Sequence, residues 1–90
     1  MSQAIVDPGE LRRFAQNLRK FNTELEDRLA SLSAQLQSLG GSWRDQEHKR
    51  FAEEFEGHIR AIARYTESTE QYVPFLLRKA ERIEEYLEQR

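Results

Sequence analysis

The stretch that decides the fold is LGGSWRDQEHKRF, residues 39–51, near the middle of a chain of 90 residues. It contains the only two adjacent glycines, Gly40 and Gly41, and the only tryptophan, Trp43. Glycine readily adopts the left-handed conformation that ends many helices, so we expect a helix to stop before Gly40. Ser42 is then expected to cap a second helix, with Asp45 three residues later closing the cap. The stretch therefore predicts a helix end, a tight turn over 40–42 and a new helix from residue 43.

A first helix over 8–39 is predicted from its N-terminal signals and its apolar spacing. Asp7 is suited to the N-cap, Pro8 to the first helical position, and Glu10 lies three residues after the cap. Apolar side chains then follow the spacing of an amphipathic helix. Leucines recur every seven residues, with further apolar residues between them: Leu11, Leu18, Leu25, Leu32 and Leu39, joined by Phe14, Phe21, Leu29 and Leu36.

A second helix is predicted over 43–73, continuing after a kink at Pro74 to about residue 88. Its main apolar stripe advances in steps of four and three, and an aromatic row lies beside it. The stripe comprises Phe55, Ile59, Ile62, Thr66, Thr69, Val73, Leu76, Ala80, Ile83 and Leu87; the row comprises Phe51, His58, Tyr65, Tyr72 and Tyr86. Proline removes one backbone hydrogen bond and bends a helix. Because the stripe keeps its phase through Pro74, we expect the helix to be kinked but continuous.

The short connection forces the two helices to run antiparallel. The predicted fold is thus all-α, a single helical-hairpin domain over 1–90. Two helices alone leave much of each stripe in water, so we expect the hairpin to dimerise into a four-helix bundle. The shared interior is expected to comprise Leu18, Leu25, Leu29, Leu32, Phe55, Ile59 and Ile62.

The two predicted helices differ in length. With a turn at 40–42, Pro8 lies level with about Pro74, so residues 75–90 extend past the first helix by about 24 Å, at about 1.5 Å per residue. The apolar side chains of this overhang would need a partner helix to cover them. They are Leu76, Ala80, Ile83 and Leu87.

Composition narrows the function classes. The chain has no cysteine, which excludes disulfides and thiolate zinc sites. Its net charge of −2, from 14 basic and 16 acidic residues, is not the footprint of a nucleic-acid-binding protein. The N-terminus lacks the pattern of a cleaved signal peptide, and no window approaches the roughly 18 apolar residues of a membrane span. If the protein leaves its cell, we expect it to do so by a route that needs no N-terminal signal peptide, and we expect no membrane insertion.

Catalytic and metal-binding patterns are weak. Glu54 and His58 can share a helix face, but no second histidine or cysteine joins them, and zinc sites use three or four ligands. No serine or threonine has a base at a suggestive spacing. We therefore expect no enzyme activity, cofactor or metal.

A basic patch on the first helix raises the question of phosphate or nucleic-acid binding. It comprises Arg12, Arg13, Arg19 and Lys20, whereas the end of the chain carries Glu81, Glu84, Glu85 and Glu88. Phe14 and Phe21 are assigned to the apolar stripe, which leaves no base-stacking platform beside this patch. We expect a solvated face, or contact with the acidic tail of another subunit, and no nucleic acid.

A helical hairpin of about this length, with tryptophan after a glycine-containing turn, resembles the WXG family of small type VII (ESX-type) secretion substrates. The resemblance covers nearly the whole chain, and includes an aromatic residue, Phe51, eight residues beyond Trp43. It implies homodimeric or heterodimeric four-helix bundles, exported folded without a cleaved signal. Two features depart from the family pattern. Asp45 replaces the glycine of Trp-x-Gly, and no tyrosine is followed four residues later by Asp or Glu, the export signal of the family.

The sequence thus predicts a non-enzymatic protein that acts through helix–helix dimerisation and partner binding, with the secretion machinery among its candidate partners. The alternative is a cytoplasmic adaptor or chaperone-like protein that binds a partner helix through its C-terminal overhang. Two interpretations of Trp43 stay open, a plug at the hairpin end or a partly exposed docking residue. The turn motif and candidate docking residues are Gly40, Gly41, Trp43, Asp45 and Phe51.

Overall fold

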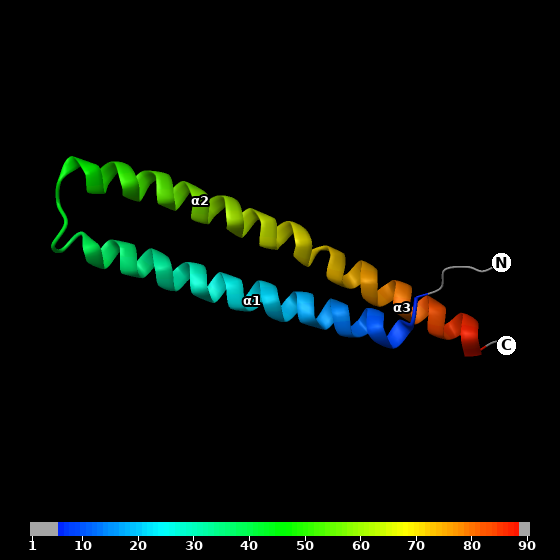
Figure 1. Cartoon of the computed structure of the whole chain (residues 1–90). Helices are drawn as coiled ribbons and strands as arrows, with labels where there is room; N and C mark the ends of the chain where they lie inside the picture. The colour runs from blue at the N-terminus through cyan, green and yellow to red at the C-terminus, as the bar shows by residue number, and fades with distance from the viewer. Residues whose placement is uncertain (1–5, 89–90) are drawn as a thin grey trace. The chain divides into compact units, whose positions relative to one another are not determined.

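The computed structural model describes residues 6–88, which form three helices: α1 (Pro8–Leu39), α2 (Gln46–Glu70) and α3 (Tyr72–Glu88) (Figure 1). The described part of the chain is therefore all-α. None of its helices combines the length and the apolar character that crossing a membrane requires. The bounds of α1 are those that the sequence predicts.

The start of α1 is capped as expected. The Asp7 carboxylate accepts a hydrogen bond from the Gly9 backbone N–H at 2.8 Å, and the Asp7 carbonyl accepts one from Leu11 at 3.0 Å. Pro8 occupies the first helical position, where its missing N–H costs nothing because the first N–H groups of a helix have no intrahelical partner. The prediction of Asp7 as N-cap is confirmed.

The second predicted helix is divided into two. Helix α2 ends at Glu70, α3 begins at Tyr72, and the Gln71 N–H donates to the Ser68 carbonyl at 3.3 Å, three residues back (Figure 1). Pro74 has no N–H to give to the Glu70 carbonyl, whereas in the first turn of a new helix its missing donor is tolerated. The prediction of a continuous, kinked helix through Pro74 is therefore wrong.

The chain forms two compact units, which we describe separately. The turn unit is Thr23–Glu67, and holds the C-terminal half of α1, the connection and most of α2. The end unit is Met1–Asn22 together with Ser68–Arg90, of which the structure describes 6–22 and 68–88. In each unit part of α1 is paired with a later helix.

In the turn unit, α1 and α2 are antiparallel neighbours joined by a short connection (Figure 1). Leu29 and Leu36 are buried, with 7% and 5% of their surface exposed. Across the pair, the Ser33 hydroxyl donates to the Glu56 carboxylate at 2.9 Å. Thr66 of α2 is also buried, with 3% of its surface exposed, so the turn unit has two leucines and a threonine at its core.

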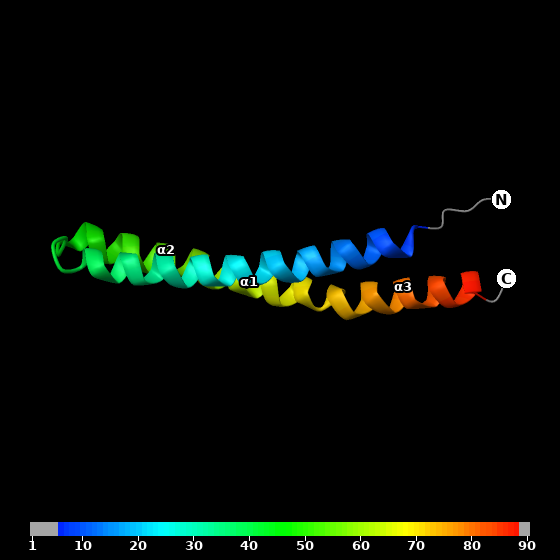
Figure 2. The same ribbon diagram turned by 90° about the horizontal axis from the view of Figure 1, so that it is seen from below.

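In the end unit, the N-terminal half of α1 lies antiparallel to α3 (Figure 2), as the contacts of Arg12 with Glu84 and of Arg19 with Glu70 require. The buried side chains are small, and the fully covered ones are Ala15, Val73 and Ala80. Small side chains at a helix contact let the two backbones approach closely.

A buried polar group lies in the end unit as well. Asn22, 3% exposed, donates from its amide to the Glu70 carboxylate at 2.9 Å and accepts from the Thr69 hydroxyl at 3.3 Å. Burial of an amide is costly unless both its donor and its acceptor are used, and here both are. Other pairings of the two helices would leave the amide unsatisfied, so this group favours one register.

The predicted overhang of residues 75–90 past the first helix is wrong. Ala80 is fully buried, and Arg12 of α1 contacts Glu84 of α3, so α1 covers α3 at least that far. Residues 43–45 and 71, which the prediction counted as helical, are not helical, and this accounts for part of the difference. Leu76 and Ile83 are half-buried and Leu87 is exposed, and their role in partner binding stays a prediction.

Candidate interaction surface

The connection after α1 tightens through short-range hydrogen bonds. The Gly40 and Gly41 N–H groups donate to the carbonyls of Gln37 and Ser38, both at 3.1 Å, which is the i to i−3 pattern. No glycine of the described chain has a positive φ, so the predicted left-handed end at Gly40 is wrong. Glycine is favoured here for a different reason: a Cβ at Gly40 would lie only 3.1 Å from the Gln37 carbonyl oxygen.

Helix α2 is capped by Asp45 rather than Ser42. The Asp45 carboxylate accepts from the His48 backbone N–H at 3.0 Å, which is the N-cap to N3 contact. The Ser42 hydroxyl only reaches back to the Leu39 carbonyl at 3.5 Å. The connection therefore runs from residue 40 to 45, and the prediction that Ser42 caps a helix starting at residue 43 is wrong.

Arg44 has a role that the sequence analysis missed. Its guanidinium donates to the Gly41 carbonyl at 3.2 and 2.9 Å, satisfying an acceptor just beyond the end of α1. An arginine three residues after the second turn glycine, Gly41, is the signal that could have suggested this contact.

Trp43 begins a row of aromatic side chains in the turn unit. Its ring is half-buried, 4.9 Å from the His48 ring in an edge contact and 5.9 Å from Phe51. Phe51 in turn stacks on Phe55 at 5.4 Å. These contacts hold Trp43 against α2 and leave part of its surface exposed, so both interpretations of this residue stay predictions.

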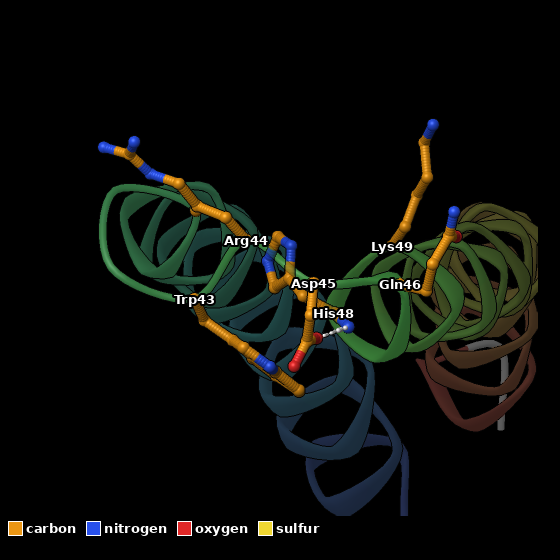
Figure 3. A pocket seen from close by; sticks show the side chains of 7 residues that line it. Trp43, Arg44, Asp45, Gln46, His48 and Lys49 are labelled. Carbon is orange, nitrogen blue, oxygen red and sulfur yellow. Dashed lines mark hydrogen bonds between the residues drawn. The ribbon is translucent and has the colours of Figure 1, made fainter.

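A shallow hollow surrounds the connection (Figure 3). Its lining residues are Gly40, Trp43, Arg44, Asp45, Gln46, His48 and Lys49. The Asp45 carboxylate is already engaged in the cap, and His48 Nε2 is buried without a hydrogen-bond partner among the described residues. Within residues 6–88, no group of three or more His, Cys, Asp or Glu side chains could hold a metal ion.

A larger apolar surface lies on one side of the turn unit, which we call its outer face. The polar contact of Ser33 with Glu56 lies on one side of the buried Leu29 and Leu36, and the outer face lies on the other. It comprises Leu25, Arg28, Leu32, Gln35 and Leu39 of α1 with Phe51, Phe55, His58, Ile62 and Tyr65 of α2. A groove on this face is lined by Leu32, Gln35, Leu36, Leu39, Phe51 and Phe55.

The end unit has an outer face of the same construction. Arg12 and Arg19 lie on one side of the buried Ala15 and contact α2 and α3 carboxylates, so the opposite side of the helix pair is the outer one. This face comprises Leu11, Phe14, Leu18 and Phe21 of α1 with Thr69, Tyr72, Leu76, Lys79, Ile83 and Tyr86. It is strongly aromatic and largely in contact with water.

The position of Phe14 and Phe21 corrects the sequence analysis, which placed them on the core stripe. Each is 58% exposed, and the buried residues are their successors, Ala15 and Asn22. The missed signal is a second series at seven-residue spacing, whose members are Ala15, Asn22, Leu29 and Leu36. Phe14 and Phe21 are therefore available for contact with other molecules. The expectation of no nucleic-acid binding had taken them to be covered by the chain itself.

The predicted dimer-interface residues lie in the core or on the outer face, except Ile59, which belongs to neither set. Leu29 is used by the chain's own core and retains 7% of its surface, whereas Leu32 is 43% exposed. The half-buried members are Leu18, Leu25, Phe55, Ile59 and Ile62. All but Leu29 thus keep surface for a partner, and their contact with one stays a prediction.

The basic patch is partly neutralised within the chain. The Arg12 guanidinium forms two hydrogen bonds with Glu84, one of them at 3.2 Å, and Arg19 contacts Glu70 at 3.3 Å. The hydrogen bonds between Arg12 and Glu84 hold the pKa of Glu84 below its ordinary value and raise that of Arg12. Two of its four residues, Arg12 and Arg19, therefore meet acidic side chains of their own chain, whereas Arg13 and Lys20 are exposed. The expectations were a solvated face or contact with the acidic tail of another subunit.

The geometry is that of a small all-α protein with paired helices, a capped turn that carries tryptophan, and an apolar face. The sequence matches the family described as WXG100, "Proteins of 100 residues with WXG", over residues 3–88, and the chain belongs to this family. The family consists of small helical-hairpin proteins associated with type VII secretion, which confirms the resemblance noted from the sequence. No curated protein and no solved structure matches the chain.

Proposed function

We propose that this chain is a non-enzymatic protein of type VII secretion, a single helical-hairpin domain that works by pairing with a second helical chain. The observation that carries the proposal is the exposure of large apolar side chains on the outer faces. Phe14, Phe21, Tyr72 and Tyr86 are all more than half exposed in the end unit. Contiguous apolar surface rimmed by polar residues is typical of an interaction site.

The spacing of these side chains favours a helix as the partner. Along α1 the outer-face residues advance alternately by four and three, which is the seam of a coiled coil. Covering a phenylalanine or leucine contributes roughly 1.5–3 kcal/mol, so even partial burial of such a seam offsets the cost of association. A four-helix bundle, formed with a second copy or a related chain, covers both helices of each pair.

Pairing is tested by substituting Leu25 with Asp, and Arg60 with Asp as a matched control. Leu25 is half-buried on the outer face, where an unpaired carboxylate would be buried by a partner; Arg60 is exposed on α2, away from that face. In sedimentation at high protein concentration, we expect Leu25→Asp to be monomeric and Arg60→Asp to associate as the wild type does. An associating Leu25→Asp variant contradicts pairing through this face.

Secretion is tested separately. We expect export into the medium from a bacterium with a type VII system, and loss of export when the secretion ATPase is deleted. Since the chain lacks a Tyr-x-x-x-Asp/Glu sequence, we expect export to require a partner chain that carries this signal. Retention in the cytoplasm even with such a partner would favour an adaptor or chaperone-like role instead.

A further inference from the structure

The charge on the outer faces indicates which partner they accept. Apart from tyrosines, the ionisable side chains on the outer faces are Arg28 and His58 in the turn unit and Lys79 in the end unit. All three are basic: Arg28 and Lys79 carry a positive charge, and His58 gains one when it is protonated. No Asp or Glu occupies any outer-face position within the described residues. The apolar surface is thus interrupted by side chains of one sign.

Arg28 is the critical member of this set. It follows Phe14 and Phe21 at the same seven-residue spacing, so it stands in the seam where the series would otherwise place an aromatic side chain. Arg28 is exposed and forms no hydrogen bond or ion pair with any described residue, unlike Arg12 and Arg19. A helix laid on this seam would remove water from its guanidinium, which is unfavourable unless the partner supplies a carboxylate.

A second copy of this chain supplies no such carboxylate from its own seam. In a symmetric dimer the same face meets itself, so the second copy would again offer Arg28, His58 and Lys79 and no acidic side chain at its seam positions. Glu24 and Glu54 lie on the outermost edge of the turn unit, where ion pairs are hydrated and weak. Single charged residues in a seam set partner choice in coiled coils by excluding like-charged partners.

We infer that the partner of this chain is a different helical protein that places acidic side chains in its own apolar seam, opposite Arg28, His58 and Lys79, and that self-pairing is the weaker association. The inference rests on the proposed pairing through the outer face. It adds the chemistry of the partner and the residues that select it.

The test uses a copy of the chain as the acidic partner. The triple variant R28E/H58E/K79E carries three carboxylates in the seam, and all three substitutions are at exposed positions, so its own helix pairs are preserved. The matched control is R13E/Q16E/R60E, which makes the same change in net charge at exposed positions off the outer face. Circular dichroism first establishes equal helix content, and native mass spectrometry then resolves homodimers from mixed dimers by mass.

We expect an equimolar mixture of the wild type and the seam variant to form mixed dimers about tenfold or more tighter than either self-pairs. With the control variant, mixed dimers and wild-type homodimers should differ by less than about twofold, because the seam is unchanged. Raising the salt concentration should weaken the mixed dimer with the seam variant.

The outcomes separate the two claims. A wild-type homodimer as tight as the mixed dimer overturns the acidic partner and leaves the proposed pairing intact. An equal gain in mixed-dimer affinity with the seam variant and with the control variant also overturns the acidic partner, since attraction between the net charges would then explain the gain. If no mixture and no single chain associates, the outer face does not pair helices, and both the inference and the proposed function fail.

Discussion

The turn unit and the end unit hold their helices together differently. The turn unit buries Leu29 and Leu36 of α1 and Thr66 of α2, and the Ser33 hydroxyl donates to the Glu56 carboxylate across the pair. The end unit buries Ala15, Val73 and Ala80, and adds the ion pairs of Arg12 and Arg19 and the buried amide of Asn22. Large side chains contribute apolar burial, whereas small ones give close approach and allow polar groups to select the register.

Both units nevertheless leave the same kind of surface open. Each has polar contacts on one side of its buried row and an apolar outer face on the other. The units therefore differ in the contacts that hold their own helices together. They are alike in having an apolar outer face, which is the proposed binding surface. The following substitutions test the contrast between the units, beginning with the largest expected effect.

Leu36→Ala should be the most damaging single truncation in the turn unit. Leu36 is 5% exposed, and removing a buried leucine side chain leaves a cavity that costs about 2–5 kcal/mol of the free energy of unfolding. Urea unfolding at a fixed protein concentration measures the loss. Leu39→Ala, at an exposed position of the same helix, is the control and should lose far less. Equal losses would mean that Leu36 is not in the core.

Ala80→Leu should destabilise the end unit by overpacking, whereas Leu36→Ala destabilises the turn unit by leaving a cavity. Ala80 has no exposed surface, so a larger side chain must push α1 and α3 apart, with a loss of about 1–3 kcal/mol from overpacking. The same substitution at the exposed Ala30 should be nearly neutral. A stabilised Ala80→Leu variant would show that the end unit has room in its core and is not closely packed.

Asn22→Asp tests the buried polar group. The substitution replaces the donor to Glu70 by a carboxylate and brings two negative charges together, so stability at neutral pH should fall by roughly 1–3 kcal/mol. The pKa of such a pair is raised on folding, so the deficit should shrink as the pH falls and the carboxylates protonate. Adding Glu70→Gln should recover much of the loss at neutral pH. A deficit unchanged by pH and by the second substitution would contradict this contact.

Asp45→Ala should cost about 1 kcal/mol, because Asp45 is the N-cap of α2. Ser42→Ala should have almost no effect, since the Ser42 hydroxyl makes only a 3.5 Å contact with the Leu39 carbonyl. Thermal unfolding of the two variants in parallel compares them. The reverse ranking would restore Ser42 as the cap and move the start of α2 back.

Glu84→Gln should have the smallest effect, because the ion pair with Arg12 is partly exposed and screened by water. The pKa of Glu84 is lower folded than unfolded, so the contribution of the pair is present above the ordinary carboxyl pKa and disappears as the pH falls through the folded value. The difference in unfolding free energy between Glu84→Gln and the wild type should therefore vanish in acid. A difference that persists there would mean that the side chain acts through packing instead.

The sequence was most informative where structure depends on neighbouring residues. The bounds of α1 followed from Asp7 and Pro8 at one end and the glycines at the other, all local signals. Ser42 and Asp45 are both good caps, and the choice between them depends on the Gly40–Arg44 backbone path, which propensity does not determine. Pro74 predicts an interruption of the helix near this point. The interruption falls at Gln71 because the Glu70 carbonyl is the one that loses its N–H donor.

The outer face was harder to predict for a physical reason. On α1, Phe14, Ala15 and Leu18 belong to adjacent rows that repeat every seven residues, so periodicity reveals an apolar side without saying which row its own chain covers. The polar contacts of Glu70 and Glu84 decide this, and they involve residues distant in sequence. In the end unit, the ion pairs of Arg12 and Arg19 and the amide contact of Asn22 thus determine which side of α1 faces outward. The spacing of hydrophobic residues alone does not predict these contacts.

The central claim is that one chain leaves its apolar outer face open and gains stability when another chain covers it. The most direct test is the thermal unfolding midpoint, measured over a roughly hundredfold range of protein concentration for the wild type and for its mixture with R28E/H58E/K79E. The account predicts a midpoint that rises with concentration, and rises more in the mixture. A midpoint independent of concentration in both samples would contradict it.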